Sequence, residues 1–215
     1  DWNGTYLHCD GYVGYKKLVG KTLCGCLVHA KRKFHEAYEI NKNNEYAKQG
    51  ETYLRKLFQL ETKADEVELS LRERLEMRQT KSKQVLDEFY SWISQIESKI
   101  LPKSLIGKAI TYVINQKEYL ENFLKDGRIQ LSNNLVTQSV KPFVIGRSNW
   151  LFANTPNGAN ASTLIYSIIQ SAILNNLIPQ KYLTFVFDTI QSGGDASLLV
   201  PWSDEIPESC KNKKS

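Results

Sequence analysis

Two stretches decide the fold: Thr5-Tyr-Leu-His-Cys-Asp-Gly11 and, after a short amphipathic segment, Thr22-Leu-Cys-Gly-Cys-Leu-Val28. Each contains a run of β-prone residues, and the turn signal Asp10-Gly11 ends the first run. The second run leads into residues 29–38, whose apolar side chains have helical spacing. This order of strand, helix, strand and helix predicts an α/β core with parallel strands, and it places Asp10 at the carboxyl end of a strand.

Residues 44–125 have a different character, because their apolar side chains recur with the helical period. One apolar stripe, typical of a packed helix, consists of Leu86, Phe89, Ile93, Ile96 and Ile100. Pro102 interrupts the pattern, which then resumes and continues until Asp126-Gly127 ends it. We therefore expect an all-α insertion over residues 44–128, after a partial α/β core over residues 1–43.

The chain is expected to return to the core over residues 129–158. Asn133-Asn134 opens a short helical pattern, Pro142 stops it after Lys141, and an apolar, strand-like stretch follows. A C-terminal segment, residues 159–215, completes the chain. The elements expected in it are helices over residues 159–175 and 179–191 and a loose tail from Glu208 to Ser215.

The composition excludes some classes of protein. Of the 215 residues, 41% are hydrophobic and 24% are charged, and no apolar run approaches the roughly twenty residues that span a bilayer, so a membrane protein is excluded. Four cysteines without the spacing of a disulfide framework favour a reducing compartment, and we expect the cytoplasm. The sequence begins at Asp1 without a Met or a signal peptide, which is typical of a fragment.

The net charge of +5 permits nucleic-acid binding without implying it. The basic residues form three clusters: Lys31-Arg32-Lys33; Arg72, Arg74, Arg78, Lys81 and Lys83; and Lys141 with Arg147. A solvated helix face is the ordinary interpretation of each cluster. The first and third clusters are also candidates for contacts with phosphates. Trp150 is a candidate for stacking on a base, although a core position suits it equally well.

Asp10, Cys26 and His29 are the clearest candidates for metal ligands. A carboxylate at a strand end can bind a hard divalent cation, but Asp also suits a turn or a helix cap at such a place. Cys26-x-x-His29 invites a zinc interpretation, yet its spacing is incomplete, because no second Cys/His pair follows before the isolated Cys210. A buried, hydrogen-bonded His29 is the plainer alternative.

Asp10-Gly-Tyr-Val-Gly-Tyr15, followed by Cys26-Leu-Val-His-Ala-Lys-Arg-Lys-Phe34, resembles the insertion sequence 66 family of DDE transposases. In that family a similar Asp-x-Tyr-x-Gly-Tyr motif begins with the second catalytic Asp. The resemblance covers nearly the whole chain, and its further motifs include Leu101-Pro-Lys-Ser104, Phe123-Leu-x-Asp-Gly-Arg128, Asn133-Asn134, Val140-Lys-Pro142, Ile145-Gly-Arg-x-Asn-Trp-Leu-Phe152 and Leu199-Val-Pro-Trp202. Motifs of this length in this order are far more specific than a single short motif.

The resemblance implies a bacterial transposase with a ribonuclease-H-like core. Such an enzyme uses magnesium or manganese, binds transposon ends and target DNA, and is a candidate homo-oligomer. Asp10 would be its metal ligand, and Cys26, His29, Asn133 and Asn134 would lie near the active site. The family's third acid is a Glu three residues after the Asn-Asn pair, and this register places Thr137 there.

A neutral hydroxyl cannot replace a carboxylate in a two-metal site, so Thr137 implies a loss of catalysis. The first catalytic Asp of the family lies upstream of Asp1, with the N-terminal strands of the sheet. Thr137 also has a milder interpretation. With Asn134 as a helix cap, it occupies the third helical position, where Glu would complete a capping box.

The fold expected is therefore an α/β fold with a large all-α insertion, consisting of a partial ribonuclease-H-like core without its N-terminal strands, followed by C-terminal helices. The function expected is that of a transposase part that is inactive on its own. One alternative is a non-catalytic remnant that binds DNA or mediates oligomerisation. Another is a decayed gene fragment whose exposed sheet edges make it poorly soluble.

Overall fold

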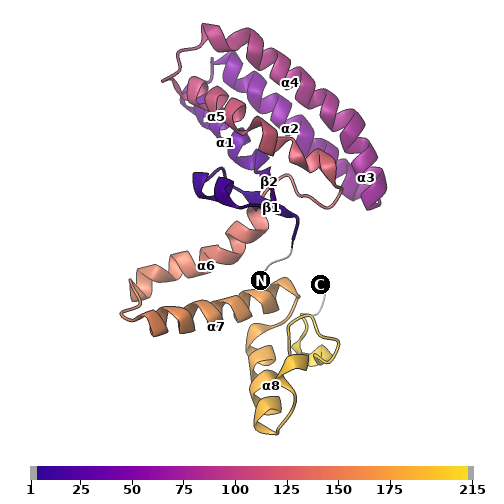
Figure 1. Cartoon of the computed structure of the whole chain (residues 1–215), viewed down its shortest axis with the longest axis vertical. Coiled ribbons are helices and arrows are strands. Elements are labelled where there is room, and N and C mark those ends of the chain that lie inside the picture. Colours follow the sequence, from indigo (N-terminus) through magenta and orange to yellow (C-terminus); the bar gives the residue numbers. More distant parts are fainter. Residues whose placement is uncertain (1–3, 213–215) are drawn as a thin grey trace. The chain divides into compact units, whose positions relative to one another are not determined.

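The structure, a computed structural model, describes residues 4–212, apart from the side chains of Val13 and Lys16. The chain divides into two compact units, Asp1–Leu135 and Val136–Ser215 (Figure 1). The first unit consists of a strand pair and a helical bundle, and the second unit is helical. Each unit has its own cluster of buried apolar side chains, so each is described separately.

The strand pair of the first unit confirms the predicted parallel pairing. β1 (Tyr6–Cys9) and β2 (Thr22–Gly25) are parallel, with Tyr6 opposite Thr22 and Cys9 opposite Gly25. Within residues 4–212 these two strands form the whole sheet. A pair of four-residue strands is less than a ribonuclease-H-like core, and that part of the prediction is not confirmed.

The first two helices build most of the core beside the sheet. α1 (Leu27–Ile40) contains the predicted helix and extends it at both ends, and α2 (Glu45–Glu66) follows it. The Asn44 side chain caps α2 by accepting a hydrogen bond from the Ala47 amide at 3.0 Å. Phe34 of α1 and Leu54 of α2 are fully buried in the same apolar cluster.

The rest of the first unit confirms the predicted all-α character of this region. It comprises α3 (Leu71–Met77), a π-helical turn (Arg78–Ser82), α4 (Lys83–Ile96) and α5 (Leu105–Leu120). Pro102 lies in the break between α4 and α5, as expected. Figure 1 shows the helices side by side as a bundle, with β1 and β2 along one side of it.

The second basic cluster is not a solvated helix face throughout. Arg78 is fully buried, and its Nε and one terminal nitrogen donate to the two carboxylate oxygens of Glu61 at 2.8 and 2.7 Å. Its other terminal nitrogen donates to the carbonyls of Phe123 and Asp126 at 3.2 and 2.8 Å. Arg74 also donates to Glu61, at 2.7 Å. The ordinary interpretation was therefore wrong for Arg74 and Arg78, because Glu61 of α2 pairs with both inside the fold.

In the second unit the expected strand after Pro142 is wrong. α6 (Asn134–Trp150) continues through Pro142, and α7 (Pro156–Leu174) and α8 (Pro179–Gln191) follow. Phe143 and Trp150 are seven residues apart on one face of α6, and both contact Tyr166 of α7 at ring-centroid distances of 5.1 and 5.6 Å. A helical period brings these rings together, whereas a strand would send them to opposite faces.

The two closing helices are confirmed, but the expected tail is wrong for its described part. Cys210 is buried, and its carbonyl accepts a hydrogen bond from the Ile178 amide at 2.7 Å. The Asn212 amide donates to the Asn176 carbonyl at 2.8 Å. Apolar packing of Cys210 against Leu177 and Tyr182 holds this segment, while residues 213–215 lie outside the described part. Within residues 4–212, no helix has the length and apolar character that crossing a membrane requires.

Candidate functional site

Asp10 lies where the sequence predicted it, immediately after the carboxyl end of β1. Its Oδ1 accepts a hydrogen bond from the Tyr12 amide at 3.1 Å, an Asx turn that holds the carboxylate beside the strand end. Its side chain is exposed. Gly11 has a φ of +92°, which a residue with a Cβ rarely adopts. The turn therefore leaves the carboxylate accessible.

Helix α5 supports this turn through two residues that sequence reasoning missed. The Tyr112 hydroxyl donates to the Asp10 carbonyl oxygen at 3.4 Å. One helical turn later, the buried Gln116 side chain lies 3.3 Å from the place that a Cβ on Gly11 would occupy. Their spacing of four residues on one helix face was visible in the sequence, but nothing there indicated which element the face contacts.

The beginning of α1 contributes Cys26 and His29. Cys26 is fully buried at the N-cap, and its carbonyl accepts a hydrogen bond from the His29 amide at 3.2 Å. Burial lowers the pKa of His29, Arg32 lowers it further, and Asp10 opposes them. The His29 Nδ1 is buried and has no hydrogen-bond partner among the described residues. His29 is therefore neutral at pH 7, with one ring nitrogen unsatisfied.

The three residues of the first basic cluster point in different directions. Lys33 Nζ lies 5.0 Å from the centroid of the Tyr112 ring, on the side of Asp10. Arg32 is exposed and lowers the pKa of His29. Lys31 Nζ lies instead over the Phe58 ring of α2, at 5.9 Å. Arg32 and Lys33 therefore lie on the side of Asp10 and His29, whereas Lys31 lies against α2.

These side chains do not fit the magnesium or manganese site that the resemblance implies. Within the described residues, no three His, Cys, Asp or Glu side chains gather as a metal site would require. The four cysteines are free, buried thiols, so the zinc alternative at Cys26 and His29 gains no support. Asp10 is the carboxylate at this strand end, and a single carboxylate is a poor match for two divalent cations.

The predicted residues after the insertion lie at the beginning of α6. Asn134 is the first residue of α6, so Asn133 precedes the helix and Thr137 is its fourth residue. The milder interpretation made Asn134 the helix cap and Thr137 the third helical residue. In the structure the helix includes Asn134, so Thr137 is one position further along it than that interpretation expected. Thr137 is exposed on the first turn.

Lys141, Arg147 and Trp150 belong to the second unit. Lys141 and Arg147 are exposed on α6, and Trp150 is 38% exposed. The Trp150 ring lies over Gly146, where a Cβ would come within 2.0 Å of it, so this position requires glycine. Trp150 packs against Phe143 and Tyr166, and its stacking on a base remains a prediction.

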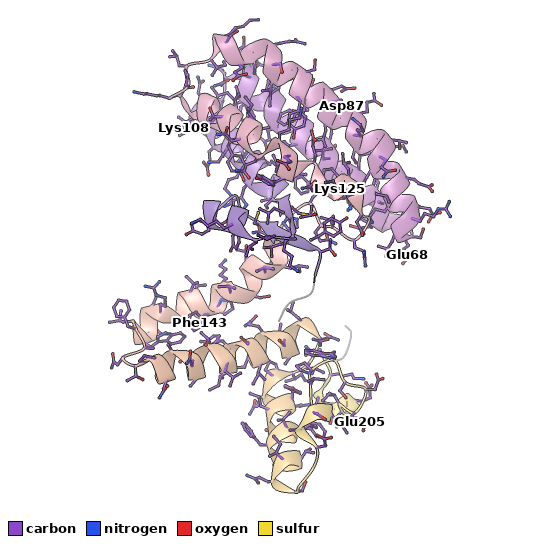
Figure 2. All side chains as sticks on the ribbon, in the orientation of Figure 1. Glu68, Asp87, Lys108, Lys125, Phe143 and Glu205 are labelled. Atoms are coloured by element: carbon purple, nitrogen blue, oxygen red, sulfur yellow. The ribbon has the colours of Figure 1, made fainter. Side chains whose placement is uncertain are left out.

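A pocket of about 370 Å³ lies between α6 and α7. Its lining residues are Ser139, Val140, Phe143, Thr163, Tyr166, Ser167, Gln170, Ser171 and Leu174. Phe143, labelled in Figure 2, is the aromatic residue that α6 contributes. Sequence reasoning missed this pocket because it expected a strand where α6 continues.

A carboxylate, an imidazole and two cations, from Asp10, His29, Arg32 and Lys33, thus lie near the carboxyl end of β1. The chain belongs to the IS66 family of transposases, since the family model described as "Transposase IS66 family" matches residues 1–161. The resemblance stated from the motifs is therefore confirmed.

Three curated proteins of Sinorhizobium fredii (strain NBRC 101917 / NGR234), all named as uncharacterized, are similar to the chain. Uncharacterized protein y4hP is 30% identical over 93% of this chain and 39% of its own length, and y4qI is 31% identical over 92% and 38%. Uncharacterized protein y4jD is 30% identical over 94% and 41%. The chain thus spans less than half the length of these relatives. No solved structure matches it.

Proposed function

We propose that this chain is the part of a DDE transposase that carries its second catalytic aspartate, Asp10, together with a DNA-binding edge. Further strands beside β1 and β2 would complete a ribonuclease-H-like core. The observation that carries the proposal is the position of Asp10 at the end of a parallel strand, beside His29, in a chain of this family. We infer that the DNA bound is a transposon end or its target.

The chain is proposed to be inactive on its own. Phosphoryl transfer by two metals needs carboxylates that converge from several elements, because hard cations must be held by oxygen ligands and must contact both reacting oxygens. Thr137 stands where the family has its third acid, and its hydroxyl stays neutral. A non-catalytic remnant that binds DNA, or that mediates oligomerisation, is the second candidate, and the Thr137 substitution favours it.

In the proposed DNA complex, Arg32 and Lys33 contact phosphates beside Asp10. Arg32 presents a planar group with several donors and Lys33 a point charge, and both can approach a phosphate from one side of α1. The neutral His29 between them can accept or donate a single hydrogen bond. Lys31 is left out of the proposed contact because its ammonium group lies over Phe58 of α2, whereas Lys33 lies over Tyr112, whose hydroxyl donates to Asp10.

Fluorescence anisotropy of a labelled DNA duplex at several salt concentrations tests this proposal. Replacing Arg32 and Lys33 with alanine should weaken binding about equally for all sequences and lower the salt slope by about 1 for each lost contact. The matched control is Lys31→Ala, which removes the same charge from the same helix and should leave both the affinity and the slope nearly unchanged. Equal effects of all three substitutions would contradict the assigned directions, and no DNA binding by the chain would contradict the proposal itself.

The inactivity is tested with the complete reading frame and a plasmid that carries the element's ends. Thr137→Glu should give end cleavage and strand transfer with magnesium or manganese, where the Thr137 protein gives none. Thr137→Gln is the control, because it restores the size of the side chain without its charge. Activity of the Thr137 protein equal to that of the Glu variant would show that another residue serves as the third acid.

A further inference from the structure

The pocket between α6 and α7 combines aromatic rings with neutral polar groups. Phe143 and Tyr166 meet edge to face at 5.1 Å and are both half-buried. Hydroxyl or amide groups of Ser139, Thr163, Ser167, Gln170 and Ser171 line the same space. At about 370 Å³, the pocket lies within the range of roughly 300–1,000 Å³ that small ligands occupy. An occupant with a flat apolar face and hydrogen-bonding edges suits this lining.

Two of these hydroxyl groups have already used their hydrogens within α7. The Thr163 hydroxyl donates to the Asn160 carbonyl at 2.9 Å, and the Ser167 hydroxyl donates to the Thr163 carbonyl at 2.8 Å. A hydroxyl oxygen that donates its hydrogen keeps lone pairs for accepting. These two oxygens are therefore acceptors, and they favour an occupant that carries N–H donors.

The charge around the pocket favours an anionic partner. The sequence has no Asp or Glu from Ile129 to Phe187, whereas Lys141, Arg147 and Lys181 lie in this range. Arg147 lies one helical turn after Phe143, outside the lining itself, and its guanidinium group lies 6.0 Å from the centroid of the Phe152 ring. The pocket surface itself is mainly apolar, with the rings of Phe143 and Tyr166 as its flat faces, so an anionic partner that carries a flat apolar group suits it.

We propose that this pocket binds an unpaired nucleobase that carries an exocyclic amino group, at a frayed or single-stranded end of the bound DNA. The base stacks against Phe143 and Tyr166, its amino group donates to the oxygens of Thr163 and Ser167, and Arg147 contacts the adjacent phosphate. Adenine, cytosine and guanine carry such an amino group, and thymine does not. The inference rests on the proposed function only in requiring that the chain binds DNA.

The experiment measures the affinity of the whole chain for duplexes that differ only in one unpaired nucleotide at an end. An overhang of dA, dC or dG should bind about tenfold more tightly than an abasic end, which has neither base stacking nor edge contacts. A dT overhang should bind with intermediate affinity, because it keeps the stacking but has no amino group for Thr163 and Ser167. Ser167→Ala should reduce the preference for dA over dT while leaving duplex binding unchanged. Tyr166→Leu should remove the preference altogether, and Phe187→Leu, an exposed aromatic residue of α8, is its matched control.

A second measurement does not depend on the variants. Photocrosslinking of an overhang that carries 5-iododeoxycytidine should label peptides containing Phe143 or Tyr166. Crosslinks to other peptides would contradict the proposal that the pocket binds an unpaired base, and so would equal affinities for all overhangs. Neither result would contradict the proposed function, provided that the chain still binds the duplex. A chain that binds no DNA would overturn both. If the chain forms dimers that Tyr166→Leu dissociates without changing the overhang preference, a second copy occupies the pocket and the proposal is wrong.

Discussion

Arg78 shows how a single residue organises the helical part of the first unit. Its guanidinium group joins Glu61 of α2 to the carbonyls of Phe123 and Asp126, which lie after α5. The side chain is fully buried, so each of its donors needs a partner inside the protein. The π-helical turn that begins at Arg78 is the local irregularity that accompanies this arrangement.

Replacing Arg78 with Leu should lower the free energy of unfolding by about 3–5 kcal/mol, because it leaves buried carbonyls and part of the Glu61 carboxylate without donors. Urea denaturation of the two proteins measures the difference. The matched control is Arg72→Leu, whose side chain is 89% exposed and pairs with Glu76 within the same helix. Its effect should stay within about 0.5 kcal/mol. Similar losses for both variants would show that the Arg78 network does not stabilise the fold.

His8 should make the stability of the first unit dependent on pH. Its Nε2 and the Gln130 carbonyl oxygen are 2.6 Å apart, while its Nδ1 is buried without a partner among the described residues. Burial lowers the pKa of His8 below its ordinary value of 6.5, and the hydrogen bond to Gln130 opposes this only in part. The folded protein thus binds a proton at His8 less readily than the unfolded chain does.

Well above pH 6.5 both states hold His8 neutral, and the residue does not affect the balance between them. As the pH falls below 6.5, the unfolded chain takes up the proton first, so the free energy of unfolding should decrease until the pH reaches the folded pKa. Urea denaturation at pH 7.5 and 5.5 measures this decrease. In His8→Gln the decrease should be smaller, with His29 contributing what remains. An unchanged decrease would assign the effect to other groups.

At the scale of elements, Pro142 is the feature of α6 that propensity alone does not explain. A proline inside a helix removes a hydrogen bond to the residue four positions earlier and disfavours the helix by about 3 kcal/mol. α6 nevertheless continues, because its aromatic side chains pack on α7 with helical spacing. The helix is formed by this contact, in opposition to the local preference at residue 142.

Pro142→Ala should therefore raise the stability of the second unit, by up to about 3 kcal/mol, without changing its fold. Circular dichroism at 222 nm during urea denaturation measures both the helix content and the midpoint. The control is Pro179→Ala, at the first turn of α8, where proline is compatible with the helix and no gain is expected. A loss of helix in Pro142→Ala would mean that the proline is needed for the geometry of α6.

Elements that depend on local sequence patterns could be predicted from the sequence, whereas those that depend on tertiary contacts could not. The strand ending before Asp10, the helix after Cys26 and the helices on both sides of Pro102 follow from local patterns, and they were predicted. The course of α6 depends on contact with Tyr166, and the order of residues 208–212 depends on the Asn176–Ile178 segment. The role of Tyr112 and Gln116 was not predicted for the same reason. A periodic pattern shows that two residues share a helix face, but it does not show that this face contacts the Asp10-Gly11 turn.

At the scale of the whole molecule, the two units differ in how much apolar surface they bury. Among the described residues, the cluster of the first unit contains 21 buried side chains, whereas that of the second contains five. In α6 and α7 the buried residues are Gly146 and Ala172. Since burial of apolar surface is the main favourable contribution to folding, the second unit should be the less stable of the two.

The chain should therefore unfold in two transitions, with the second unit unfolding first. Trp92 packs in the aromatic cluster of the first unit and Trp150 in that of the second, so their fluorescence distinguishes the two events. In Trp92→Phe the transition at the higher temperature should lose most of its fluorescence signal. In Trp150→Phe the transition at the lower temperature should lose most of its fluorescence signal. A chain ending at Leu135 should keep the higher transition at nearly the same temperature. A single transition that shifts when residues 136–215 are removed would instead show that the two units fold as one cooperative structure, in which the second unit supplies part of the stability of the first.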